Sequence, residues 1–180
     1  MNIALPDRLR LAETLTADSG EPSLDPMFDL IELFFFAYRD FVSDADRHLA
    51  AYGFGRAHHR VLHFVTRQPG MTIAGLLDIL RITKQSLNRV MKDLVDQEFV
   101  ESRPGVSDRR HRLLFATPKG CRLAFDLAGI QSRRFERVLA SLPPGAHEQA
   151  RRFLLAMIDE RDRETVRERL APLPLAIAGS

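Results

Sequence analysis

Apolar residues recur along most of the chain at the spacing of amphipathic helices. A first helix is predicted over residues 27–51, and its section Leu30–Tyr38 is apolar on nearly all sides. A second, short helix follows the glycines at 53 and 55 and ends before Pro69. Such an all-round apolar helix is typical of a subunit interface, so we expect the chain to form a homodimer.

The next two predicted helices are joined by a very short turn. Thr72 can cap a helix in which apolar residues recur from Ile73 to Leu80, and Thr83 can cap another. In the latter, the predicted inward positions are Leu87, Val90, Met91, Leu94 and Val95. Two helices joined by a tight turn are typical of a helix-turn-helix.

Two strands are predicted over residues 99–103 and 111–117, separated by a charged, turn-forming segment at 104–110. Thr117-Pro118 then starts a fifth helix, which ends before Pro143. A sixth helix carries apolar positions from Ala150 to Ile158 and is densely charged beyond them.

This order predicts a mainly α fold with a small β-hairpin wing. Residues 72–117 form a winged helix-turn-helix, flanked by long N- and C-terminal dimerisation helices at 27–51 and 118–170. Together they make a single domain over 27–170. Residues 1–26 are predicted to form an irregular lead-in, and residues 171–180 a C-terminal tail.

Composition narrows the class of protein. The 180 residues carry a net charge of +2, but Arg81–Arg122 contains ten Lys or Arg against five acids, as in a surface that binds phosphate. The longest apolar stretch falls far short of the roughly 20 residues of a membrane span, and the N-terminus does not resemble a secretory signal. We therefore expect a cytoplasmic protein with no membrane partner.

The exposed face of the fourth helix carries the chemistry for reading DNA. Opposite its inward stripe stand Gln85, Asn88, Arg89 and Lys92, all hydrogen-bond donors at helical spacing. Amide and guanidinium groups can bond base edges in the major groove. Lys84 and Ser86, at the start of the helix, are placed to reach phosphate.

The predicted wing adds a second contact. Arg109 and Arg110 suit the narrow minor groove, where the negative potential favours guanidinium. Asp108 would orient one of these arginines in advance.

These segments resemble the MarR family of bacterial regulators over about residues 28–165. The resemblance rests on Ile82–Val90, on Arg103 and on Asp108-Arg109-Arg110, with Thr117 and Gly120 after them; residues 53–62 are similar to a PetP-like branch. It implies a dimer that binds a pseudo-palindromic operator, usually as a repressor that a small molecule releases, and it adds Arg103 to the DNA-binding candidates. Glu98 stands where the family often has Gly, so we expect a differently shaped helix end.

The effector implied by this resemblance is expected in a cleft between the first, second and fifth helices. Phe36 and Tyr38 offer aromatic surface, and Arg39 and His63 offer polar or cationic groups, a combination suited to an amphipathic or aromatic anion.

Three alternatives remain open at this stage. His59 and His63, one helical turn apart, could hold a metal, and Cys121 between Lys119 and Arg122 could sense oxidants. A winged helix can also serve as a protein-interaction module without binding DNA. No nucleophile elbow, phosphate loop or dinucleotide fingerprint is present in the sequence, so we expect neither an enzyme nor a cofactor.

Overall fold

The structure is a computed structural model that describes residues 26–105 and 112–170. The chain divides into two compact units, residues 1–38 and 39–180. The helices are α2 (Phe28–Leu49), the 3-10 turn η1 (Ala50–Tyr52), α3 (Arg56–Arg67), α4 (Ile73–Leu80), α5 (Lys84–Asp96), α6 (Pro118–Ala140), α7 (Ala146–Ala156) and α8 (Glu160–Arg169). The strands are β1 (Met71–Thr72), β2 (Val100–Pro104) and β3 (Arg112–Ala116).

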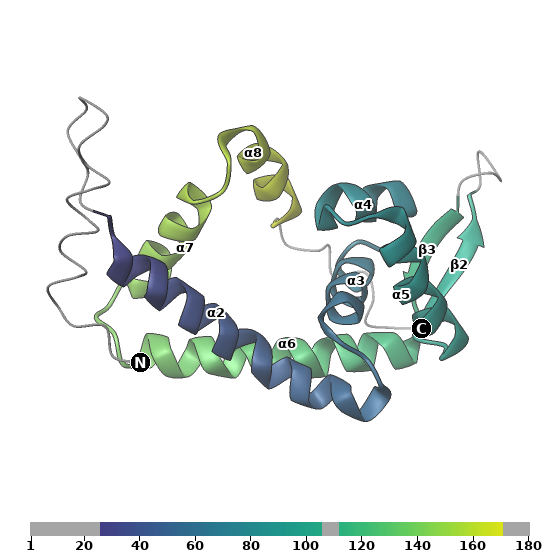
Figure 1. Cartoon of the computed structure of the whole chain (residues 1–180), viewed down its shortest axis with the longest axis horizontal. Coiled ribbons are helices and arrows are strands. Elements are labelled where there is room, and N and C mark those ends of the chain that lie inside the picture. Colours follow the sequence, from purple (N-terminus) through teal and green to yellow (C-terminus); the bar gives the residue numbers. More distant parts are fainter. Residues whose placement is uncertain (1–25, 106–111, 171–180) are drawn as a thin grey trace, which may run out of the picture. The chain divides into compact units, whose positions relative to one another are not determined.

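The core of the second unit lies between α3, α4, α5, α6 and the sheet (Figure 1). The apolar stripes of these helices supply it, as their spacing predicts. Val95 is an exception to the predicted inward stripe of α5, because 41% of it is exposed. The fully buried large side chains are Phe99, Leu49, Leu62, Leu76, Leu87, Leu94, Leu114, Leu127, Val61, Val65 and Val100.

The sheet has three antiparallel strands in the order β1-β3-β2. β2 and β3 form the predicted hairpin, with Val100 opposite Ala116 and Pro104 opposite Arg112. The sequence pattern did not predict β1, which pairs Met71 with Leu114. Two residues carry no detectable period, and only their place beside β3 makes them a strand.

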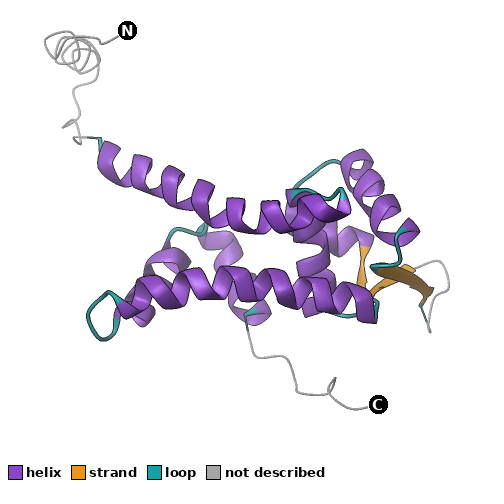
Figure 2. Cartoon of the chain, turned by 90° about the horizontal axis from the view of Figure 1, so that it is seen from below, coloured by secondary structure: helices purple, strands orange, loops and turns teal. Residues whose placement is uncertain are grey.

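The C-terminal part of the second unit contains three helices rather than the two expected from the sequence. α6 begins beside the sheet and runs away from it (Figure 2). The predicted sixth helix is broken, with α7 ending at Ala156 and α8 beginning at Glu160. Arg163 stabilises the break by donating to the carbonyl oxygens of Ile158 and Ala156, both at 2.9 Å. These bonds satisfy carbonyls that a continuous helix would have paired.

The predicted first helix crosses the boundary between the two units. It is α2, which ends at Leu49, two residues before the predicted end, and continues as η1 to Gly53 in left-handed backbone (φ 69°). In the second unit, Ala45 and Leu49 are fully buried and Asp44 is paired with Arg134 of α6 at 2.6 Å. None of the described helices is long and apolar enough to cross a membrane.

Candidate nucleic-acid interface

Two side-chain caps define where the helices of the helix-turn-helix begin. Thr72 Oγ1 accepts a hydrogen bond from the Gly75 amide at 3.1 Å, and Thr83 Oγ1 accepts one from the Ser86 amide at 3.2 Å. Each bond satisfies a first-turn amide that has no partner within its helix. Between the helices, Arg81 takes left-handed backbone angles (φ 49°, ψ 43°) and so turns the chain from α4 into α5.

The inner side of α5 packs on α3, and one polar contact adds to the packing. His58 Nδ1 accepts from the Gly55 amide at 3.1 Å, and its ring stacks on Phe54 with 4.7 Å between centroids. Because Nδ1 is an acceptor, Nε2 carries the hydrogen in the neutral ring and donates to Asp93 Oδ2 of α5 at 3.1 Å. The orientation of α5 is therefore held by a directional bond as well as by its buried apolar residues.

The outer side of α5 presents all six residues that the sequence assigned to DNA contact. Every one of them has an exposed side chain, and their donors lie on the face that α3 does not cover, since the intervening positions are buried. The set is Lys84, Gln85, Ser86, Asn88, Arg89 and Lys92.

The cations on this face are not equivalent. Lys92 is paired with Asp96 one turn further along the helix, and that hydrogen bond is the main cause of a raised Lys92 pKa. Lys84 and Arg89 have no ion pair within residues 26–105 and 112–170. Their charges are therefore the less compensated ones on the face, which suits them to an external anion.

The hairpin holds Arg103 on the sheet. Its guanidinium lies 4.6 Å from the centroid of the Phe115 ring and is paired with Glu101. Opposite, Arg112 donates to Ser102 Oγ at 3.0 Å and to the Ser102 carbonyl oxygen at 2.8 Å, a cross-strand clamp that the sequence analysis missed. Asp108, Arg109 and Arg110 lie outside the described residues, so their assignment stays a prediction.

Glu98 lies in the short connection between α5 and β2, where the chain passes from the helix into the wing. Glu98 takes the left-handed conformation (φ 60°) that Gly would adopt more easily. The expectation of a differently shaped helix end is therefore wrong, because Glu98 adopts the glycine-like conformation. The Glu98 carbonyl accepts from Thr117 Oγ1 at 2.6 Å. Lys119 donates to the Gln97 carbonyl oxygen at 2.9 Å and lies over the Phe99 ring. Long-range bonds thus hold a backbone conformation that the residue type disfavours.

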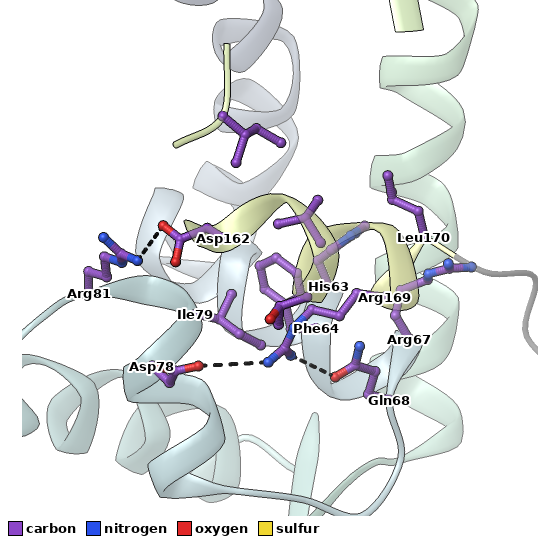
Figure 3. Close-up of a pocket in the computed structure, with 13 residues that line it drawn as sticks. His63, Phe64, Arg67, Gln68, Asp78, Ile79, Arg81, Asp162, Arg169 and Leu170 are labelled. Atoms are coloured by element: carbon purple, nitrogen blue, oxygen red, sulfur yellow. Dashed lines mark hydrogen bonds and ion pairs between the residues drawn. The ribbon is translucent and has the colours of Figure 1, made fainter. Parts of the chain in front are cut away.

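The four predicted effector residues are divided between the two units. Phe36 and Tyr38 belong to the first unit, whereas Arg39 and His63 belong to the second. His63 lines a cavity between α3, α4 and α8 (Figure 3), and Arg39 is not among the residues that line it. Arg39 Nε instead bonds Asp40 Oδ1 at 2.8 Å. The expected effector cleft therefore stays a prediction, and the cavity between α3, α4 and α8 contains His63 of its four residues.

The residues of the metal and redox alternatives have ordinary surroundings. Partial burial is the main cause of a lowered pKa at both His59 and His63; next in size are the effect of His63 on His59 and of Arg67 on His63. Among the described residues, no three His, Cys, Asp or Glu side chains gather into a metal-binding group. Cys121 is partly buried near the Ala116 carbonyl, with 3.9 Å between sulfur and oxygen.

A capped helix-turn-helix with a donor-lined second helix, followed by an antiparallel hairpin, defines a winged helix-turn-helix. Comparison with protein families matches residues 52–111 to the MarR family. The HTH-type transcriptional regulator PetP of Rhodobacter capsulatus is 42% identical over 151 residues, which are 79% of this chain and 91% of the relative. The chain belongs to the MarR family of transcriptional regulators, as the resemblance predicted, and the similarity to its PetP-like branch is confirmed.

Solved structures agree on the fold. A crystal structure of MarR superimposes with a TM-score of 0.60 at 19% identity and covers 84% of this chain and 98% of its own. A Staphylococcus aureus MepR–DNA complex gives a TM-score of 0.58 at 18% identity and covers 70% and 93%. The predicted fold class, mainly α with a winged helix-turn-helix, is thereby confirmed.

Proposed function

We propose that this regulator binds double-stranded DNA with α5 in the major groove and Arg89 on a base edge. The observation that carries the proposal is the two-sided character of α5: all six donor side chains are exposed while Leu87, Val90, Met91 and Leu94 are buried. A major groove admits one helix, and an exposed guanidinium without an internal partner can bond the two acceptors of guanine. Lys84 and Ser86, in the first turn, would contact phosphate.

The wing would supply a second, less selective contact. Arg103 lies near the turn-side end of β2, where it is paired with Glu101 and stands over the Phe115 ring. We assign Arg109 and Arg110 to the minor groove, oriented by Asp108, on the basis of the sequence. Arg110→Ala should weaken operator and random DNA alike and make the slope of log affinity against log salt shallower by about one.

We further propose that the chain acts as a homodimer. In the first unit, a run of large apolar residues from Met27 to Tyr38 is exposed. In the second unit, Phe135 and Leu154 line a groove of about 720 Å³ between α6, α7 and α8. Exposed apolar surface on this scale marks an interface, and a two-fold dimer would place two α5 helices in successive major grooves. Light scattering at micromolar concentration tests this, and a stable monomer would refute it.

The DNA proposal is tested with an operator selected from a random duplex library. Arg89→Ala should weaken operator binding by about 1–3 kcal/mol and binding to random duplex much less, because a base contact carries discrimination. Arg60→Ala is the matched control: Arg60 is exposed on α3, the helix that covers the inner side of α5. It should leave both affinities unchanged.

Equal losses on operator and random DNA would show that Arg89 contacts only phosphate. If the wild-type protein selected no duplex from the library, the hypothesis that this winged helix is a protein-interaction module without DNA binding would replace the proposal. We assign the chain no catalytic role. Because its target would be the bacterial chromosome, we infer that it acts in the cytoplasm. As a regulator of this kind it would repress transcription until a small molecule binds.

A further inference from the structure

Both carboxylates of α5 lie in its last two turns, close to Arg89. Asp93 stands one turn beyond Arg89, at the i,i+4 spacing that lets opposite charges pair on the surface of a helix. Asp96 is already paired with Lys92, which has the same spacing from it. Asp93 is therefore the carboxylate of this helix that is placed to neutralise Arg89.

Asp93 is instead bonded to α3. Its Oδ2 atom lies 3.1 Å from Nε2 of His58, and within residues 26–105 and 112–170 no ion pair joins it to Arg89. The Asp93 side chain is 44% exposed, so it remains accessible from the surface that carries Arg89. Because burial does not keep the two groups apart, the contact with His58 decides which partner Asp93 takes.

The His58 ring is fixed on two sides. Its Nδ1 atom accepts from the Gly55 amide at 3.1 Å, and the ring stacks on the buried Phe54 with 9° between the planes. Only 14% of the His58 side chain is exposed, so an Nε2 hydrogen without an acceptor would destabilise the fold. An exposed pair between Arg89 and Asp93 contributes less than this bond does, and Asp93 therefore stays with His58.

We infer that His58 is a positioning residue for DNA reading: it holds Asp93 on α3 and thereby leaves the Arg89 guanidinium free for a base edge. The inference rests on the role proposed above for Arg89 and adds the residue that keeps it available. A guanidinium already paired with Asp93 would have to break that pair before it could bond guanine, which weakens binding. His58 acts through Asp93 and does not itself contact DNA.

Two substitutions of His58 separate its two hydrogen bonds. The Asn side chain places an oxygen where Nδ1 lies, so His58→Asn keeps the bond to the Gly55 amide but cannot reach Asp93. The longer Gln side chain brings its amide group to the position of Nε2, so His58→Gln keeps a donor for Asp93. His58→Asn therefore releases Asp93, and His58→Gln is its matched control.

The release of Asp93 is measured by NMR on the isotope-labelled full chain without DNA. The Arg89 Nε–H signal, assigned by its loss in Arg89→Lys, should exchange with water equally fast in wild type, His58→Gln and Asp93→Asn. In His58→Asn the signal should shift and its exchange should slow, because a carboxylate now pairs with the guanidinium. Adding Asp93→Asn to His58→Asn should reverse both changes. An Arg89 signal that does not respond to His58→Asn would overturn the inference, whether or not the protein binds DNA.

Operator affinity tests the consequence for DNA reading. His58→Asn should weaken binding to the selected operator about threefold, the size expected for an exposed ion pair that must first be broken, and binding to random duplex less. His58→Gln should bind the operator as the wild type does. The double variant His58→Asn/Asp93→Asn should recover the lost affinity, because the competing charge is gone. If the double variant stays as weak as His58→Asn, the loss does not come from Asp93 and the inference is wrong.

A further background shows whether the effect passes through Arg89. In Arg89→Ala, His58→Asn should cause no additional loss of operator affinity, and a further threefold loss there would contradict the inference. Thermal unfolding should give nearly the same Tm for His58→Asn with and without Asp93→Asn, so that recovered affinity cannot be recovered folding. A wild-type chain whose Arg89 signal behaves as expected but which binds no DNA would refute the proposed function, while the hold of His58 on Asp93 would stand.

Discussion

Gly120→Ala tests the closest backbone approach in the winged module. Gly120 lies in the first turn of α6, where its amide donates to Thr117 Oγ1 at 3.1 Å. A Cβ at this position would lie 2.0 Å from the Phe99 carbonyl oxygen and 3.3 Å from Leu62 Cδ1. Real Cβ contacts stay beyond 3.0 Å, so the Phe99 carbonyl would have to retreat by about 1 Å. That carbonyl accepts from the Thr117 amide at 3.0 Å, and the movement breaks this bond.

The expected loss of stability follows from these contacts. Overpacking against the backbone lowers the free energy of unfolding by about 2 kcal/mol, and the broken hydrogen bond lowers it by about 2 kcal/mol more. The better helix propensity of alanine raises it by about 1 kcal/mol. The net loss of about 3 kcal/mol should lower Tm by about 6–12 °C in a chain of this size. Because the junction joins α5 to the wing, operator affinity should fall as well.

Gly129→Ala provides the matched control on the same helix. Among the described residues, a Cβ there would meet only the flexible Arg133 Nη1, at 3.4 Å, so the substitution should raise stability by about 0.5–1 kcal/mol. Thermal unfolding followed by circular dichroism measures both variants. If Gly120→Ala melts within 1 or 2 °C of the wild type, the close approach of Phe99 and Gly120, and with it the reasoning, is wrong.

Three further predictions concern stability. Leu94→Ala removes a fully buried side chain and should cost about 2–5 kcal/mol in urea unfolding, with an unchanged slope m as the check that only the native core is affected. Thr83→Ala removes the cap of α5 and should cost about 1 kcal/mol, whereas Thr83→Ser should keep most of it. Because the pKa of His63 is lower in the folded state, the unfolded state takes up a proton first as the pH falls. The stabilising contribution of the neutral His63 ring is therefore complete above about pH 6.5 and is lost as the pH falls below that value. His63→Gln should therefore flatten the pH dependence of Tm below pH 6.5, and an unchanged profile would contradict that assignment.

The local features of the winged module were readable from the sequence. Thr83 caps α5 where it was predicted to, because an N-cap needs only a hydroxyl three residues before a free amide. The exposed donor face of α5 followed from helical spacing, since burial of Leu87 and Leu94 leaves Arg89 on the other side. These features depend on contacts between residues a few positions apart, so residue type and order determine them.

Contacts between distant residues decided the rest. β1 exists because Met71 meets Leu114, and α7 is separated from α8 where Arg163 caps the freed carbonyls. Glu98 holds a glycine-like conformation because Thr117 bonds its carbonyl. The sequence by itself therefore determined the helix-turn-helix, its caps and its reading face. Only the tertiary structure decided where the helices end and which side chains share a cavity. Both depend on contacts between segments that lie far apart in the sequence, which no local pattern predicts.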